Sequence, residues 1–193
     1  YLLGWKPCVG DYGLLAPLYA HLGRDPYPAS LMQQRAPRVY RWVERMNRPD
    51  QDAPEFFTPG TDFLNNDEIP ETLMAVLRAV AEDFVPETRA AASVINDWLG
   101  RQQPEAGAAA VGRLGNLVGS AEFSVRGQTI TALASPYRFY LLQRVQAIYA
   151  GLPLAEQASV EQMLQACGMH EMLSIKLDRV MGRADNLEAR SEE

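Results

Sequence analysis

The sequence predicts a mainly α-helical protein with one small β-hairpin. Long segments place apolar side chains every three or four positions, which is the spacing of one face of a helix. Several of these segments begin with Pro or end before Gly, as helices often do. Strand-forming residues flank a Gly turn near residues 121–133, so the hairpin is expected there.

The composition is that of an ordinary globular protein, with 47% apolar and 22% charged residues. The net charge of −6, without a run of Lys and Arg, argues against binding to nucleic acid. No apolar run reaches the roughly 18 residues of a membrane span, so no membrane segment is expected. Cys8 and Cys167 both lie in helix-like segments, which indicates reduced thiols and a cytoplasmic location.

The first helix is predicted from about Val9 to Leu22. Cys8 occupies its N-cap position, and the Asp11 carboxylate can reach back to the free N–H groups of the first turn. Pro17 predicts a kink or a weak turn within the helix. Because the segment is apolar nearly all round, it is expected to be central rather than on the surface.

This helix start resembles the buried central helix of the glutathione S-transferase C-terminal domain, which begins with Ser or Thr, two residues and Asp. A thiol accepts hydrogen bonds poorly, so Cys8 predicts a cap weaker by roughly 1 kcal/mol. The resemblance continues over further segments that look like the next helices of some bacterial members. These segments are Arg24-Asp25-Pro26, Leu31-Met32, Ala36-Pro37 and Trp42-Val43-Glu44-Arg45-Met46.

The resemblance implies a domain organisation. Residues 1–50 would be the latter part of a C-terminal-like helical domain of the transferase type. Residues 51–66 would be a linker, and residues 67–193 a helical extension with the hairpin. In the family, the activation of the glutathione thiol belongs to an N-terminal thioredoxin-like domain, which is not found in this chain.

Two functions are therefore expected. In the first, the chain is the helical half of a glutathione S-transferase-like protein and shapes a site for a small hydrophobic or electrophilic ligand. Glutathione would be the co-substrate of the full protein, a homodimer is possible, and this chain alone would hold no cofactor, metal or catalytic residue. The alternative is a non-catalytic ligand-binding or protein-interaction module with the same helical fold. The resemblance gives Asp11 a structural role only.

Short helices are expected from Ala29 to Arg35 and from Pro37 to about Asn47. The next helix opens at Asp67-Glu68-Ile69-Pro70 and is expected to end at Gly100, with an interruption at Pro86. Its predicted inner stripe consists of Leu73, Leu77, Val80 and Phe84, with Ile69 and Val76 alongside, and after Pro86 the stripe continues with Val94, Ile95, Trp98 and Leu99.

The last part of the chain is predicted to be helical after the hairpin. Ser135 and Pro136 start a strong helix that Gly151 closes. Further helices are expected over residues 155–167 and 169–183, followed by a polar tail that frays from Ala184.

The helix that starts at Ser135 carries the best candidate site outside the resemblance. A helix N-terminus attracts anions, and an adjacent Arg adds positive charge. The residues that could line a pocket for an aromatic or anionic ligand are Tyr137, Arg138, Tyr140 and Arg144. The alternative, which we favour, is an ordinary core helix with outward hydroxyl groups and buried Leu141 and Leu142.

Other candidates have simpler explanations. Tyr12 and Tyr19 could face a hydrophobic substrate, but core packing is the more common use of such residues. Cys167 and His170 have the spacing of two metal ligands, but a zinc site needs more. His21 is expected to bond the backbone near a helix end.

A glycine-rich stretch invites comparison with a phosphate-binding loop. Gly112, Gly115 and Gly119, with Arg113 between the first two, have the wrong spacing for the known phosphate loops, and no Lys follows. A flexible connection is therefore the favoured interpretation.

Overall fold

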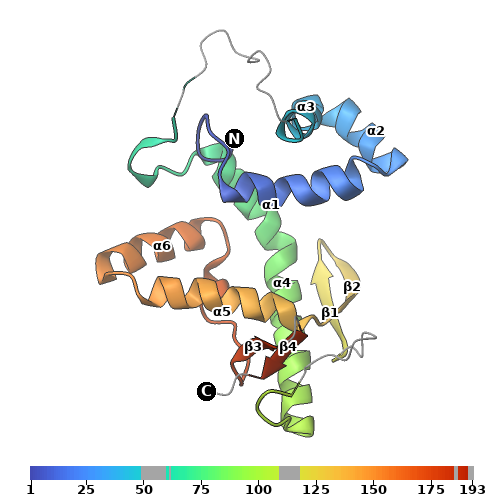
Figure 1. Ribbon diagram of the computed structural model, residues 1–193, viewed down its shortest axis with the longest axis vertical. Helices are drawn as coiled ribbons and strands as arrows, with labels where there is room; N and C mark the ends of the chain where they lie inside the picture. The colour runs from blue at the N-terminus through green and yellow to red at the C-terminus, as the bar shows by residue number, and fades with distance from the viewer. Residues whose placement is uncertain (49–59, 61, 109–117, 185–186, 191–193) are drawn as a thin grey trace. The chain divides into compact units, whose positions relative to one another are not determined.

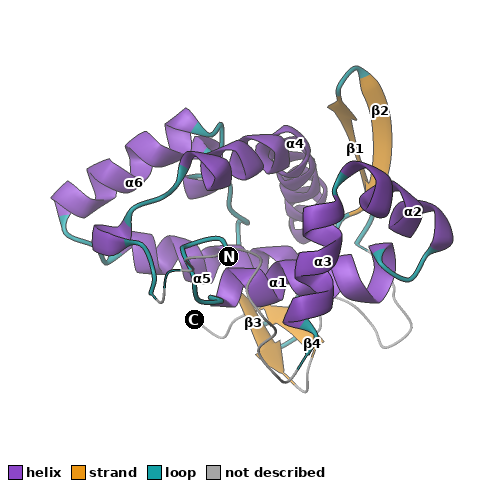
Figure 2. Ribbon diagram, turned by 90° about the horizontal axis from the view of Figure 1, so that it is seen from above, coloured by secondary structure: helices purple, strands orange, loops and turns teal. Residues whose placement is uncertain are grey.

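A computed structural model divides the chain into two compact units, Tyr1–Leu73 and Met74–Glu193, hereafter the N-terminal and C-terminal units. The structure describes residues 1–48, 60, 62–108, 118–184 and 187–190. The chain is mainly helical, as predicted, with small antiparallel sheets (Figures 1 and 2). Most of the predicted linker, residues 51–66, lies outside the described residues.

The N-terminal unit is built from short helices, of which α3 contacts α1, α2 and η1. The predicted first helix is α-helical as far as Pro17 and then widens into a π-helix, so the irregularity expected at this proline is present. Helix α2 begins before the expected Ala29 because a proline stands at its first position. The elements are α1 (Val9–Pro17), η1 (Leu18–Leu22), α2 (Pro26–Arg35), α3 (Pro37–Met46) and η2 (Asn65–Asp67).

The prediction that the first helix is buried is wrong for this structure. Asp11 is its one buried residue, whereas Val9 is 89% and Tyr12 55% exposed. Among the described residues of the unit, the buried apolar side chains are Met32 and Val43, which lie on α2 and α3. A helix that is apolar on all sides needs neighbours on all sides. Among the described elements of the unit, α3 is the α-helix that packs against α1, and it leaves residues such as Val9 and Tyr12 exposed.

A β-bridge between Gly4 and Phe63 joins the first residues of the chain to the segment before η2. The Leu64 N–H donates to the Leu3 carbonyl at 2.9 Å. Gly4 has a φ of +125°, and a Cβ atom there would lie 2.8 Å from the Asp62 carbonyl oxygen. Only glycine therefore fits this position without moving the backbone.

Replacing Gly4 with Ala should lower the stability of the N-terminal unit by about 1–3 kcal/mol, because the new Cβ strains the bridge. Gly13→Ala is the matched control, since nothing lies within 4 Å of its added Cβ. In a Trp98→Phe background, the remaining tryptophans, Trp5 and Trp42, both lie in this unit. Their fluorescence during urea denaturation therefore measures the unfolding of this unit. Equal midpoints for the two variants would contradict the prediction.

Helix α4 (Glu71–Gln102) runs without interruption through Pro86, contrary to the expected break. Val85 and Thr88 are buried on either side of the proline. Their packing outweighs the cost of a proline inside a helix, which is about 3 kcal/mol. The helix also ends beyond Gly100, and Gln103 adopts the left-handed conformation there, with a φ of 42°.

Before Pro86, the predicted inner stripe of α4 was misplaced around the helix axis. Val76 and Val80 are 41% and 40% exposed, and Ile69 is 37% exposed. Leu73, Leu77 and Phe84 are half-buried. After Pro86 the prediction is confirmed for Ile95 and Leu99, which are buried, and Val94 and Trp98 pack against the core. The full buried face consists of Met74, Ala81, Val85, Thr88, Ala91, Ala92, Ile95 and Leu99. Half of these residues are small, so before Pro86 the helix leaves several larger side chains outside.

The predicted hairpin is confirmed as β1 (Ser120–Val125) paired with β2 (Gln128–Leu133). Arg126 and Gly127 have φ values of 50° and 77°, as a type I′ turn requires. Arg126 also forms an ion pair of 2.8 Å with Glu82 of α4. The hydrogen bond to Glu82 raises the pKa of the Arg126 guanidinium above its usual value.

Two of the predicted later helices are present, as α5 (Pro136–Ala150) and α6 (Leu154–Ala166). The Tyr149 hydroxyl of α5 donates to the Glu161 carboxylate of α6, and this bond raises the pKa of Tyr149. The expectation for Leu141 is wrong, because its side chain is 42% exposed, and Leu142 is half-buried. Phe139, which is 2% exposed, is the residue of α5 that enters the core.

The predicted helix over residues 169–183 is wrong. A short 3₁₀ turn, η3 (His170–Leu173), is followed by irregular chain and then by β3 (Met181–Ala184). Strand β3 pairs with β4 (Leu187–Arg190), where a frayed tail was expected. Ile175 and Leu177 are half-buried while Lys176 and Asp178 are exposed, so this segment follows the period of two of extended chain.

The core of the C-terminal unit collects residues from α4, β1, α5 and β3. Figure 1 shows α5 and β3 beside the lower half of α4, within this unit. The buried members are Ala91, Ala92, Ile95, Leu99, Val118, Ala121, Ala134, Phe139 and Met181.

Candidate functional site

One face of α5 holds the irregular segment before β3. Gln146 donates from Nε2 to the carbonyl oxygens of Met172 and Ile175, both at 2.8 Å. One turn earlier on the same face, Gln143 binds both backbone groups of Met181. Gln143 thus serves Met181 as a neighbouring β-strand would, by accepting from the N–H and donating to the carbonyl.

Helix α4 holds the same segment from another side. Asn96 accepts from the Asp178 N–H at 2.9 Å and donates to the Lys176 carbonyl at 3.3 Å. We call Asn96, Gln143 and Gln146 the amide clamp. These three side chains bind main-chain groups of the segment between η3 and β3 and of the residues at its two ends, Met172 and Met181.

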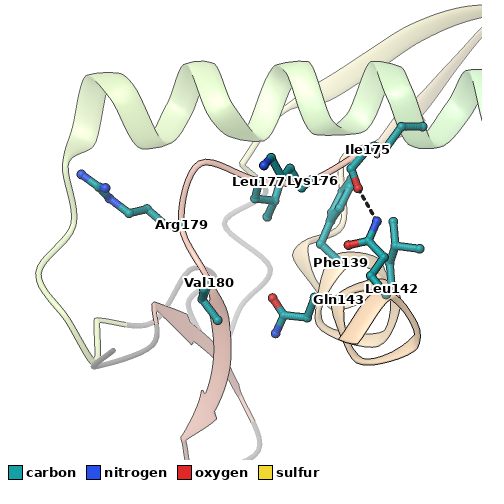
Figure 3. Close-up of a pocket in the computed structure, with 9 residues that line it drawn as sticks. Phe139, Leu142, Gln143, Ile175, Lys176, Leu177, Arg179 and Val180 are labelled. Atoms are coloured by element: carbon teal, nitrogen blue, oxygen red, sulfur yellow. Dashed lines mark hydrogen bonds between the residues drawn. The ribbon is translucent and has the colours of Figure 1, made fainter. Parts of the chain in front are cut away.

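The clamped segment and α5 enclose a pocket of about 190 Å³. In Figure 3, Phe139, Leu142 and Gln143 of α5 lie on one side and Ile175, Leu177 and Val180 on another, and the bond from Gln146 to the Ile175 carbonyl is drawn. The remaining lining residues are Gln146, Lys176 and Arg179.

The lining of this pocket is apolar apart from two amides and two cations. Lys176 and Arg179 are its charged members, both exposed, and no carboxylate from the described part of the chain lines it. Asp178 lies on the same segment but does not line the pocket. The walls therefore suit an apolar group, and the local charge suits an anion.

The structure brings together three of the four residues predicted on α5. The rings of Tyr137 and Tyr140 stack with centroids 6.2 Å apart, and the Arg144 guanidinium lies 5.7 Å from the Tyr140 centroid. Arg183 of β3, which the sequence did not indicate, lies 5.3 Å from the Tyr137 centroid. None of these residues lines the pocket, which opens on the neighbouring face of α5.

Arg138 points away from this group and toward α4. It forms an ion pair with Glu87, donates to the Thr88 hydroxyl at 3.1 Å and lies 5.0 Å from the Phe84 ring centroid. Thr88 is fully buried, and its hydroxyl donates in turn to the Phe84 carbonyl at 2.6 Å. Arg138 thus joins α5 to α4 and does not contribute to the predicted ligand pocket.

In the N-terminal unit, Asp11 takes the position predicted for it. Its Oδ2 accepts from the Cys8 N–H at 2.9 Å, and its Oδ1 accepts from the Leu2 N–H at 3.0 Å. The side chain is 1% exposed. The second bond extends the capping box, because it also holds the segment before the helix.

A second pocket, of about 450 Å³, lies beside this helix start. Its lining residues are Leu3, Cys8, Phe63, Leu64, Glu68 and Ile69. Tyr12 and Tyr19 do not line it. Tyr19 accepts a hydrogen bond from Arg24 at 2.8 Å, and the Arg24 guanidinium also lies 4.8 Å from the ring centroid. These tyrosines are therefore not brought to a common ligand site.

The remaining candidates form no site in the described part of the chain. Cys167 is buried and donates to the Leu164 carbonyl at 3.5 Å, while His170 and His21 are exposed. Among the described residues, no three metal-ligating side chains lie together. Gly112, Arg113 and Gly115 lie outside the described residues.

Comparison with known proteins finds no relative. No family model, no curated protein and no solved structure matches the chain. Where the structure describes the chain, none of its helices has the length and apolar character needed to cross a membrane. The features of the described chain that bear on its function are the two pockets and the residues around them.

Replacing Asp11 with Ala should destabilise the protein by about 1–2 kcal/mol, because two N–H groups lose their acceptor. Asp25→Ala is the control, since Asp25 stands at the N-cap of α2 without a side-chain capping bond. Thermal denaturation of both variants measures the difference. A loss of ligand binding at unchanged melting temperature would contradict the structural role of Asp11.

Replacing Gln143 with Glu tests the amide clamp. The side chain keeps its size, but a carboxylate cannot donate to the Met181 carbonyl, so we expect a loss of about 1–3 kcal/mol. Gln165→Glu, at an exposed position of α6, introduces the same charge elsewhere in the unit. Urea denaturation followed by circular dichroism compares the two, and equal stabilities would show that the clamp bond contributes nothing.

Proposed function

We propose that this chain is a non-catalytic module that binds a small, largely apolar ligand between α5 and residues 175–180. The observation that carries the proposal is a pocket with five aliphatic or aromatic lining residues, which lie on α5 and on a segment that the amide clamp binds to α4 and α5. Apolar cavities of about 150 Å³ take up benzene, so a pocket of about 190 Å³ suits a ligand slightly larger.

The rigidity of the pocket supports the same proposal. Its outer wall is fixed by bonds from the side chains of Gln143 and Gln146 to the main chain, and Gln146 uses both of its N–H groups in them. A preformed apolar site loses little conformational entropy when a ligand enters. Phe139 anchors the inner wall in the core of the unit.

The test uses a matched pair of variants on α5. Leu142 lines the pocket and Leu141 does not. We expect 1-hexanol or benzene to bind saturably to the wild-type chain in NMR titrations. Leu142→Trp should fill the pocket and abolish binding, whereas Leu141→Trp should preserve it. Absence of saturable binding to the wild type, or equal binding to both variants, would refute the proposal.

A second candidate function is that of a glutathione S-transferase-like protein of cytoplasmic location. It is favoured by the capped helix start at Asp11 and by the largely apolar pocket of about 450 Å³ beside it. In this proposal the chain shapes the site for the hydrophobic substrate, and a thioredoxin-like domain elsewhere in a longer protein activates glutathione.

A conjugation assay tests this second candidate. The intact gene product and this chain are each supplied with glutathione and 1-chloro-2,4-dinitrobenzene. We expect turnover by a product that contains a thioredoxin-like domain and none by this chain alone. Clear turnover by the chain alone, or an intact product without such a domain, would contradict the candidate.

A further inference from the structure

We infer that the ligand of the pocket between α5 and residues 175–180 is a short monocarboxylate, with its hydrocarbon tail inside and its anionic head at Lys176. This inference rests on the proposed function and adds the chemical class of the ligand. Three features support it: the volume of the pocket, the side-chain amides that are already bonded to the main chain, and the positive charge of the lining residues.

The size of the pocket limits the tail. Its volume of about 190 Å³ exceeds the roughly 150 Å³ that hold a benzene molecule, so the part of the tail that the pocket holds is about six carbon atoms long. Phe139, Leu142, Ile175, Leu177 and Val180 give this tail apolar walls. Burial of the tail supplies most of the affinity, because each methylene contributes to transfer from water.

The side-chain amides that line the pocket are not free to bind the head group of the ligand. Gln146 donates both of its N–H groups to main-chain carbonyls, and Gln143 donates to the carbonyl and accepts from the N–H of Met181. A neutral polar head would therefore find few donors. A carboxylate needs a cation instead, and Lys176 lines the pocket. Its side chain leaves the segment on the side opposite to Ile175 and Leu177, so its long flexible stem has to bring the ammonium round to the head group.

The charges of the lining favour an anion over a cation. Lys176 and Arg179 line the pocket, no acidic residue among the described ones does, and Asp178 between them lies outside the lining. In Figure 3 the Arg179 guanidinium extends away from Phe139 and Leu142, so it acts through its field rather than by contact. Such fields extend about 8 Å at physiological salt. Lys176 should therefore matter more than Arg179.

The experiment compares hexanoate with its neutral analogue hexanamide by NMR titration of the full chain at low salt. Hexanoate should bind about 1.4- to 5-fold more tightly, which corresponds to the roughly 0.2–1 kcal/mol measured for exposed charge pairs. Lys176→Gln should remove this preference, and Arg179→Gln should reduce it. Arg101→Gln removes the same charge at an exposed position of α4 that does not line the pocket, and should leave the preference unchanged.

The outcomes separate this inference from the proposed function. If hexanamide binds as tightly as hexanoate, the pocket binds apolar groups but the carboxylate class is wrong. If neither compound binds, the proposed function fails and the inference with it. A preference for hexanoate that survives Lys176→Gln also overturns the inference, because the cation would then lie elsewhere.

Discussion

The C-terminal unit depends on hydrogen bonds from amide side chains to the main chain. The segment between η3 and β3 belongs to no helix or strand, and unpaired backbone groups near a core are costly. Asn96 on α4 binds the Lys176 carbonyl and the Asp178 N–H, and Gln146 on α5 binds the Ile175 carbonyl, while Gln146 and Gln143 also bind Met172 and Met181 at the two ends of the segment. Strand β3 begins at the residue that Gln143 binds, so the clamp also determines where the second hairpin starts.

A second set of polar contacts fixes the helices that carry the clamp. Arg138 at the start of α5 binds Glu87 and Thr88 of α4, and their partial burial limits screening by solvent. Small residues on the buried face of α4, such as Ala91 and Ala92, let the core pack closely around Phe139. The pocket between α5 and the clamped segment exists because these contacts hold both of its walls.

Local signals in the sequence predicted the hairpin at Arg126-Gly127 and the boundaries of α5, because turn and capping preferences act over a few residues. They also indicated that Asp11 would reach the N–H of Cys8. They failed for residues 169–183, whose conformation depends on distant amides. The alternation of Ile175 and Leu177 with polar residues was a signal for extended chain that could have been used.

The candidate site was also hard to predict from the sequence, because it is formed by residues that are distant along the chain. The sequence selected Tyr137 and Arg138 by their nearness to a helix start, but the pocket lies on the neighbouring face and draws half of its lining from residues 175–180. No local pattern pairs Lys176 with Phe139. The distance along the chain between these residues means that only the tertiary arrangement shows their proximity.

The clamp has a consequence for how this protein could change over evolutionary time. The clamp binds main-chain carbonyl and N–H groups, and every residue has both except proline, which lacks the N–H. The clamp therefore does not depend on the side chains of the clamped segment. Substitutions at Lys176, Leu177, Arg179 or Val180 could therefore alter the shape and charge of the pocket while the backbone keeps its path. The side chains that line the pocket could therefore change while the backbone and the amide clamp stay the same, so that binding preferences could diverge without a new fold.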